Sequence, residues 1–160
     1  MLKAADHERI KRMAIVRKLL EEKPDKNIYS VASTATVLDA LKAMTEADTG
    51  AILISEGNKI VGIFTERDYA RQGEVKGRVA SETLIRDVMT SEMIMIKPET
   101  SVRQCAELMG RYHVRHLPVL ENDHVVGLIS LRRLAEAMVE EQKGTITELE
   151  NYIMGTGYGR

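Results

Sequence analysis

At 160 residues, the chain can bury one ordinary hydrophobic core, or two small cores that support each other, because a unit of about 60 residues is only marginally stable alone. Hydrophobic residues make up 44% and charged residues 29%, as in soluble globular proteins, and no apolar run approaches the roughly 18 residues of a membrane span. With 23 basic against 24 acidic residues, no broad positive surface for nucleic acid or an anionic membrane is expected. The charged first 23 residues are unlike a secretory signal, and a single Cys105 fits a reducing compartment, so we expect a cytoplasmic protein.

Before the main body of the chain, an amphipathic helix is expected from about Asp6 to Glu22, with the apolar positions Ile10, Met13, Val16, Leu19 and Leu20. Its apolar surface exceeds what an isolated helix can bury, which favours an interface. The remaining chain contains an internal repeat. A shift of 65 residues aligns the following pairs: Thr36 with Ser101, Val37 with Val102, Met44 with Met109, Gly62 with Gly127, Thr65 with Ser130 and Arg67 with Arg132. Between Thr49 and Ile54 we expect an offset of 66, a one-residue insertion in a helix-to-strand loop.

Each repeat predicts the same order: helix, strand, turn, strand and short helix. In the first, Thr36 and Asp39 form a capping-box pattern at the start of the helix, and apolar runs at 51–54 and 60–64 flank a turn at 56–58. In the second, Ser101 and Gln104 repeat the capping pattern, and the runs are at 117–120 and 125–129. A further short strand is expected before each helix, at Tyr29–Val31 and at Met93–Ile96.

The polar stretch from Gln72 to Thr90 is interpreted as the linker between the repeats. A separate last helix is expected after Gly144, because Thr145 and Glu148 form another capping-box pattern. The resulting division is a helix at 1–23, a first domain at 24–80, a second domain at 81–143, and a C-terminal helix and tail at 144–160.

The segment Gly62 to Asp68 carries the most specific chemistry. A buried strand ends at Thr65 where a helix begins, and a helix N-terminus presents free backbone N–H groups and a positive dipole end that suit a phosphate. The Thr65 hydroxyl adds a donor, and the Asp68 carboxylate is a natural acceptor for two ribose hydroxyls. A capping box between Thr65 and Asp68 is the structural alternative.

The second repeat differs at this place. There the sequence runs from Gly127 through Ser130 to Arg133, so Arg133 aligns with Asp68. A cation in the first turn of a helix opposes the dipole and closes no capping box. We interpret Arg133 as a departure from the usual preference for acidic residues in the first turn of a helix, with no structural reason for it. Such a departure indicates a functional position.

A glycine, two apolar residues, Thr or Ser, two variable residues and Asp form the nucleotide signature of cystathionine-β-synthase (CBS) domains, which this chain resembles over residues 24–142. The segments Thr49–Ala51, Asp87–Thr90 and Arg115–Val119 also resemble that family. The resemblance implies an α+β fold: two β-α-β-β-α domains packed as a pseudo-twofold pair, flanked by N-terminal and C-terminal helices, with a cleft that offers two related nucleotide sites.

For the first site, the resemblance implies Asp68 on the ribose and Thr65 on the phosphate. The adenine would lie among Ile28, Tyr29, Ser30, Gly50 and Ala51, and the opposite domain would lend phosphate ligands at Arg115, His116 and Arg132. Arg67 and Pro118 complete the set that the motif and the neighbouring strand suggest.

For the second site, Ser130 matches the phosphate hydroxyl, and Ile94, Met95 and Ile96 line the base slot. Arg133 cannot accept a hydrogen bond from a ribose. That site is therefore either empty or filled by a ligand with an additional phosphate, such as ATP, or by a dinucleotide such as NAD.

The sequence thus predicts a regulatory module that senses energy or redox state by binding an adenine nucleotide, AMP foremost, with ADP, ATP or NAD at the second site. We expect it to act as a homodimer on an effector protein. No nucleophile motif, P-loop or dinucleotide fingerprint is found, so we expect no catalytic residue, and no metal site either. The alternative is a structural dimerisation or interaction module with a vestigial cleft.

Overall fold

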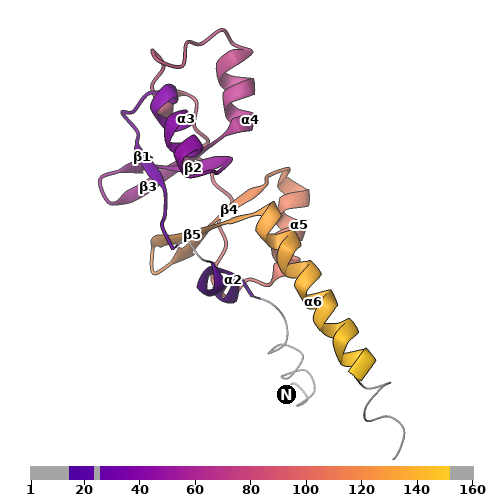
Figure 1. Ribbon diagram of the computed structural model, residues 1–160. Helices are drawn as coiled ribbons and strands as arrows, with labels where there is room; N and C mark the ends of the chain where they lie inside the picture. Colours follow the sequence, from indigo (N-terminus) through magenta and orange to yellow (C-terminus); the bar gives the residue numbers. More distant parts are fainter. Residues whose placement is uncertain (1–14, 24–25, 152–160) are drawn as a thin grey trace, which may run out of the picture. The chain divides into compact units, whose positions relative to one another are not determined.

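The computed structural model describes residues 15–23 and 26–151 of the chain (Figure 1). In chain order, its elements are α2 (Val16–Glu22), β1 (Ser30–Ala32), α3 (Val37–Glu46), β2 (Ala51–Glu56), β3 (Lys59–Thr65), α4 (Glu66–Asp68), the π-helical turn η1 (Tyr69–Glu74), the 3₁₀ turn η2 (Ile85–Asp87), α5 (Val102–Tyr112), β4 (His116–Glu121), β5 (His124–Ser130) and α6 (Leu131–Asn151). The mixed α and β content confirms the predicted fold class.

The chain divides into two compact units, which we describe separately. Of the described residues, the sheet unit comprises 26–95 and Pro118–Leu128. The helical unit comprises 15–23, Ile96–Leu117 and 129–151. The predicted domain boundaries at 23, 80 and 143 remain predictions.

The sheet unit contains a three-stranded sheet in the order β1-β2-β3 (Figure 1). Strand β1 is parallel to β2, with Ser30 beside Leu53, and β2 is antiparallel to β3, with Ala51 beside Thr65. The starts of β1 and β2 and the end of β3 therefore lie at the same end of the sheet. The strand predicted at Tyr29–Val31 is confirmed to within one residue.

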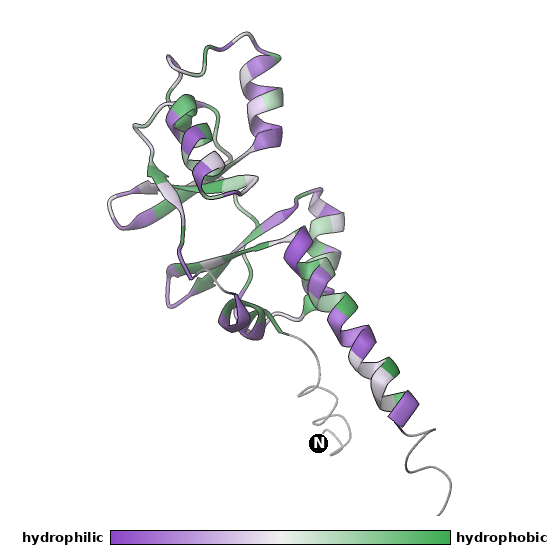
Figure 2. Ribbon diagram, in the orientation of Figure 1, coloured by the Kyte–Doolittle hydropathy of each residue, from purple (hydrophilic) through white to green (hydrophobic). Residues whose placement is uncertain are grey.

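Both faces of this sheet are buried, which explains the uninterrupted apolar run at the start of β2 (Figure 2). Alternate residues point to opposite faces of a strand. One face packs in a core with α3 and the segment before residue 90, and it comprises Val37, Ala40, Met44, Ile52, Ile54, Phe64, Ile85 and Val88. The other face contacts β5 and comprises Ala51, Leu53 and Ile63 with Ile60, Met93, Val125 and Leu128 around them. The sheet is thus the middle layer of its unit.

Helices α3 and α5 begin as the sequence predicts. The Thr36 and Ser101 side chains accept from the backbone N–H of Asp39 and Gln104, and the Asp39 and Gln104 side chains accept in return from the N-cap N–H. Both capping boxes are therefore closed, and they hold equivalent helices in equivalent positions.

A segment from outside each repeat completes it. Leu84 forms a β-bridge with Thr36, and Ile85 N–H donates to the Ala35 carbonyl at 2.8 Å. Ile15 forms the corresponding bridge with Ser101, and Val16 N–H donates to the Thr100 carbonyl at 2.9 Å. The part of the linker from Leu84 to Thr90 thus closes the first repeat, and the N-terminal segment closes the second.

The expected one-residue insertion near Thr49 is wrong. Asp48 and His113 both have positive φ at the end of the helix, at 49° and 54°, and Gly57 and Asn122 both have positive φ in the hairpin turn. The strands β2 and β3 also align with β4 and β5 at an offset of 65. The left-handed residue after each helix sets the same exit toward the strand, so the repeat continues without a shift.

The strand predicted at Met93–Ile96 is also wrong. The second sheet has two strands, β4 and β5, and in this segment a single bridge residue, Ile96, takes part in strand pairing. An apolar composition favours extended backbone, but a strand also needs consecutive hydrogen bonds with a neighbour. Met95, which is 38% exposed, lies outside such a ladder.

The expected separate helix after Gly144 is wrong as well, because α6 is one continuous helix of 21 residues. The Thr145 hydroxyl donates to the Glu141 carbonyl at 3.2 Å, so Thr145 lies inside the helix and does not cap it. One glycine costs a helix interior about 1 kcal/mol, too little to break it. None of the helices in the described ranges has both the length and the apolar character to cross a bilayer.

Helix α2 is the described part of the helix predicted from Asp6, whose first residues lie outside the described ranges. Val16 and Leu19 are 0% and 2% exposed, and Arg17 donates to Glu99 at 2.6 Å. The apolar face of α2 is thus buried within the helical unit. In the described part, these two apolar side chains pack inside the unit, and the prediction that this helix forms an interface with another chain stays a prediction.

Gly62 permits a close approach on which the sheet unit depends. A Cβ at this position would lie 2.6 Å from Met89 Sδ and 3.0 Å from the Thr90 carbonyl oxygen. The backbone of Thr90 exchanges two hydrogen bonds with Ile63, at 2.9 and 2.8 Å. A Gly62→Ala substitution should therefore lower the free energy of unfolding by about 1–3 kcal/mol. Urea unfolding measures the change.

Gly110→Ala is the matched control, because Gly110 lies inside α5 with nothing near the added methyl group. It should stabilise the chain by about 0.5–1 kcal/mol. If Gly62→Ala proved as stable as this control, the close approach would be refuted.

Candidate functional site

The junction between β3 and α4 holds the motif residues Thr65 and Asp68. Asp68 Oδ2 accepts from Thr65 N–H at 3.0 Å and from the Thr65 hydroxyl at 3.1 Å. The same hydroxyl oxygen accepts from Asp68 N–H at 3.2 Å. The capping box that the sequence left as the structural alternative is therefore present. The single hydroxyl proton points at Asp68, so donation to a phosphate would require it to rotate.

The expectation of free backbone N–H groups at this helix start is wrong for two of them. Glu66 N–H donates to the Gly50 carbonyl at 3.1 Å, and Asp68 N–H donates to Thr65. The second repeat has the same arrangement, since Leu131 N–H donates to the Arg115 carbonyl at 2.8 Å. The residue directly before the neighbouring strand thus supplies a partner for the first amide, and that partner is distant in sequence.

The sheet brings several other predicted site residues to the same end of the sheet as Thr65. Gly50 is bonded to Glu66 as above, Ala51 pairs with Thr65, and the Tyr29 carbonyl accepts from Leu53 N–H at 3.2 Å. Ser30 is exposed at the start of β1, and Ile28 and Tyr29 are 41% and 38% exposed. The predicted adenine and ribose residues of the first repeat are thus neighbours within one unit.

Thr90 belongs to this group and was not predicted. Its hydroxyl lies 3.5 Å from Asp68 Oδ1, the oxygen that Thr65 leaves open. The bridge with Ile63 holds its backbone in place. The Asp-Val-Met-Thr segment at 87–90 was noted in the sequence only for its family resemblance, because 22 residues separate Thr90 from Asp68.

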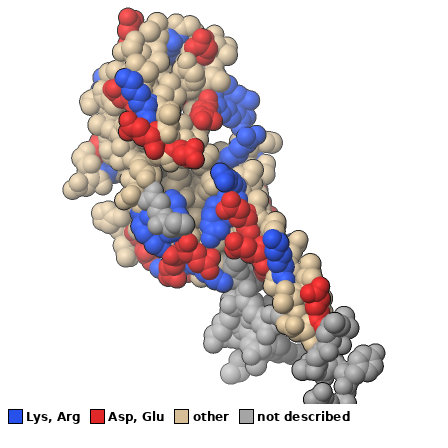
Figure 3. Space-filling view, in the orientation of Figure 1, with Lys and Arg blue, Asp and Glu red and all other residues tan. Residues whose placement is uncertain are grey.

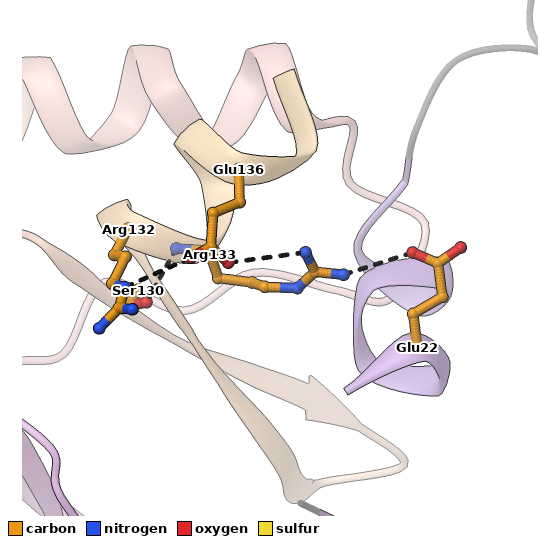
Figure 4. A network of polar contacts seen from close by, with 5 residues as sticks. All are labelled: Glu22, Ser130, Arg132, Arg133 and Glu136. Carbon is orange, nitrogen blue, oxygen red and sulfur yellow. Dashed lines mark hydrogen bonds and ion pairs between the residues drawn. The ribbon is translucent and has the colours of Figure 1, made fainter. Parts of the chain in front are cut away.

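The second junction is built differently, as Figure 4 shows. The Ser130 hydroxyl oxygen accepts from Arg133 N–H at 3.1 Å, which is half of a capping box. The Arg133 guanidinium extends away from Ser130 and pairs with Glu22 of α2 at 3.3 Å. Arg133 therefore has a structural partner, contrary to the interpretation that no structural reason accounts for it. Glu22 lies 111 residues away in sequence, which hid the pair.

The remaining basic candidates lie in the helical unit. Arg132 is exposed and pairs with Glu136 at 3.3 Å, one turn along α6. Burial lowers the pKa of the His116 imidazole below its ordinary value of 6.5, and the charge of Arg115 lowers that pKa further. His116 is therefore neutral near pH 7 and has one N–H to donate. The roles of these residues toward a phosphate remain predictions.

The apolar candidates differ in exposure. Pro118 and Ile96 are buried, at under 2% and at 4%, so their side chains serve the interior. Ile94 is half-buried and Met95 is exposed, while Arg67 is exposed on α4. Exposure thus separates Met95 and Arg67, which a ligand could touch, from Pro118 and Ile96, which it could not reach without a rearrangement.

Opposite charges alternate along the described length of α6 on the face that Figure 3 draws. Among residues 15–23 and 26–151, no three side chains of His, Cys, Asp or Glu lie together as a metal site would require. The two strand-to-helix junctions are therefore the candidate sites.

Comparison with known proteins shows the family of the chain. The CBS domain family profile matches residues 16–73 and 85–140. CBSX3, a mitochondrial CBS domain-containing protein of Arabidopsis thaliana, is 38% identical over 128 residues, which are 77% of this chain and 62% of that protein. YhcV of Bacillus subtilis, also CBS domain-containing, is 29% identical over 119 residues, which are 74% of this chain and 84% of YhcV. The chain thus spans less than two thirds of the Arabidopsis protein.

Solved structures agree. A protein with CBS domains from Burkholderia ambifaria is 37% identical, with a TM-score of 0.78 over 81% of this chain and 96% of that one. The CBS domain pair of MJ0100, solved with 5′-methylthioadenosine and S-adenosyl-L-methionine, shares the fold at 21% identity, with a TM-score of 0.68 over 78% of this chain and 99% of that one. The present chain belongs to the CBS domain family and carries two CBS domains.

Proposed function

We propose that this chain is a regulatory module that binds an adenine nucleotide at the junction of β3 and α4 and performs no catalysis of its own. The observation that carries the proposal is the state of the Asp68 carboxylate. Two bonds from Thr65 fix Oδ2, whereas Oδ1 has within the described chain a single long contact of 3.5 Å, with Thr90. An oriented carboxylate oxygen with unused lone pairs suits a pair of ribose hydroxyls.

The surrounding residues support an adenosine ligand. The same end of the sheet offers an exposed aromatic ring, apolar surface and backbone groups to a base. These groups belong to Ile28, Tyr29, Ser30, Gly50 and Ala51. The CBS pair of MJ0100 is solved with two adenosine-containing ligands, which agrees with this ligand class. We take AMP as the ligand of the first repeat, with the phosphate near Thr65.

The second repeat is proposed to reject AMP. Its motif has no carboxylate for a ribose, because Arg133 replaces the aspartate, and the guanidinium is held by Glu22. AMP should therefore bind with a stoichiometry of one per chain. We propose that a polyphosphate ligand such as ATP is the one that the second repeat can accept.

An interaction module remains the second candidate function, and one observation favours it. Helix α6 exposes five apolar side chains, the α6 stripe, at sequence spacings that place them along one side of a helix. They are Leu131, Met138, Val139, Ile146 and Leu149. A second copy of the chain is the occupant that the proposed homodimer would supply.

Substitution of Asp68 tests the nucleotide site. Asp68→Asn should weaken AMP binding about 10- to 100-fold, because a hydrogen bond to a charged group contributes about 1.5–3 kcal/mol. Isothermal titration calorimetry gives the affinity and the stoichiometry, and AMP at 100 times its dissociation constant should raise the unfolding free energy of the wild type by about 2.7 kcal/mol.

Asp39→Asn is the matched control, since Asp39 closes the same kind of capping box on α3 in the same unit. Both variants lose the charged partner of the same kind of capping box, but Asp39→Asn should bind AMP as the wild type does. Equal AMP affinity in all three proteins, or two AMP per wild-type chain, would contradict the proposed site.

The α6 stripe has a separate test. If it covers a second copy, Ile146→Lys/Leu149→Lys should convert a dimer into a monomer in light scattering, because two charges cannot be buried there unpaired. Val75→Lys is the control, because Val75 is 80% exposed and lies outside α6. A monomeric wild-type protein would rule this interface out.

A further inference from the structure

The contact between Glu22 and Arg133 joins the motif helix of the second repeat to α2 (Figure 4). One guanidinium nitrogen of Arg133 lies 3.3 Å from Glu22 Oε2, and the other lies 3.9 Å from Glu136 Oε2. The Arg133 side chain is 22% exposed and that of Glu22 is 44% exposed. The pair is therefore half-buried, yet solvent can reach it.

The first repeat has a counterpart of this contact. There the closing segment bridges to Thr36 at Leu84 and then reaches Asp68 through Thr90, at 3.5 Å. In the second repeat, the closing segment bridges to Ser101 at Ile15 and then reaches Arg133 through Glu22. In each repeat, the segment that completes the fold thus contacts the motif residue at the equivalent position. This residue is Asp68 in the first repeat and Arg133 in the second.

The chemistry of the two contacts differs. Thr90 leaves most of the acceptor capacity of Asp68 Oδ1 unused, whereas Glu22 places a carboxylate on Arg133. A phosphate oxygen and a carboxylate oxygen compete for the same guanidinium donors. Glu22 thus occupies Arg133 as an anionic ligand would.

The ends of α2 are held in different ways. At its start, the bridge at Ile15, two backbone hydrogen bonds from Val16 and Arg17, and the ion pair of Arg17 with Glu99 fix the helix. At its end, Glu22 reaches Arg133 and also Lys18, at 3.7 Å within the helix. A partly exposed pair of this kind is weak, because water still solvates both charges. A multiply charged ligand can therefore displace Glu22.

We propose that the ion pair between Glu22 and Arg133 is an anion-releasable latch on the last turn of α2. A polyphosphate group that takes the Arg133 guanidinium displaces Glu22 and loosens this turn. The ligand-dependent step rests on the proposed function, but the latch itself does not.

Hydrogen exchange of the intact chain, read by mass spectrometry on peptides covering Val16–Glu22, tests the latch without any nucleotide. Glu22→Gln and Arg133→Gln should each speed exchange in the last turn of α2 about twofold to fivefold, and the double variant should be no faster than either one, because all three lack the same pair. Glu99→Gln, which removes the ion pair at the other end of α2, should speed exchange in the first turn alone. Wild-type exchange in Glu22→Gln, or additive effects in the double variant, would overturn the latch.

ATP, inorganic tripolyphosphate and AMP then test its release. ATP should speed exchange of the last turn in the wild type to the Glu22→Gln level and leave Glu22→Gln and Arg133→Gln unchanged, whereas AMP should have no effect on this turn. An equal effect of tripolyphosphate would identify the polyphosphate chain as the releasing group, and an effect of ATP alone would show that the nucleoside is also needed. An unchanged or slower last turn in saturating ATP would overturn the release.

This design separates the two proposals. If Asp68→Asn and Asp39→Asn bound AMP with equal affinity, the proposed nucleotide site of the first repeat would be refuted. The hydrogen-exchange comparison of the Glu22 and Arg133 variants would still hold. Conversely, AMP binding that depends on Asp68, together with wild-type exchange in Glu22→Gln, would remove the latch alone.

Discussion

The fold depends on one constraint: neither repeat completes its own core, and each is closed by a segment that precedes the other repeat in sequence. Leu84 and Ile85 bond to the start of α3 as Ile15 and Val16 bond to the start of α5. Because a unit of about 60 residues is marginally stable, the buried side chains that these segments add are a substantial part of each core. The glycine at position 62 follows from the same constraint, since it admits the closing segment against β3.

The same constraint explains why the two candidate sites differ. Each closing segment continues to the strand-to-helix junction, so it supplies a neighbour for the motif residue there. In the first repeat a hydroxyl meets an acid, and the acid keeps acceptor capacity for a ligand. In the second repeat an acid meets an arginine, and the two charges satisfy each other. The second motif thus carries an arginine where the first carries an aspartate, and its closing segment supplies the acid that pairs with this arginine.

The sequence predicted the features that rest on local patterns. The capping boxes at Thr36 and Ser101, the two hairpins and the aligned motif residues all have signatures within a few residues. Long-range partners escaped prediction: Glu22 for Arg133, Thr90 for Asp68 and the Gly50 carbonyl for Glu66. The continuity of α6 through Gly144 was missed for a different reason, because the capping pattern at Thr145 is also compatible with a helix interior.

The central claim is that Asp68, oriented by Thr65, receives the ribose of an adenine nucleotide. A crystal structure of the chain with AMP tests it most directly. The account predicts both ribose hydroxyls within hydrogen-bonding distance of the Asp68 carboxylate, with Oδ1 as the principal acceptor and the bonds from Thr65 to Oδ2 retained. AMP bound elsewhere on the chain, or bound at this junction with its ribose out of reach of Asp68, would contradict it.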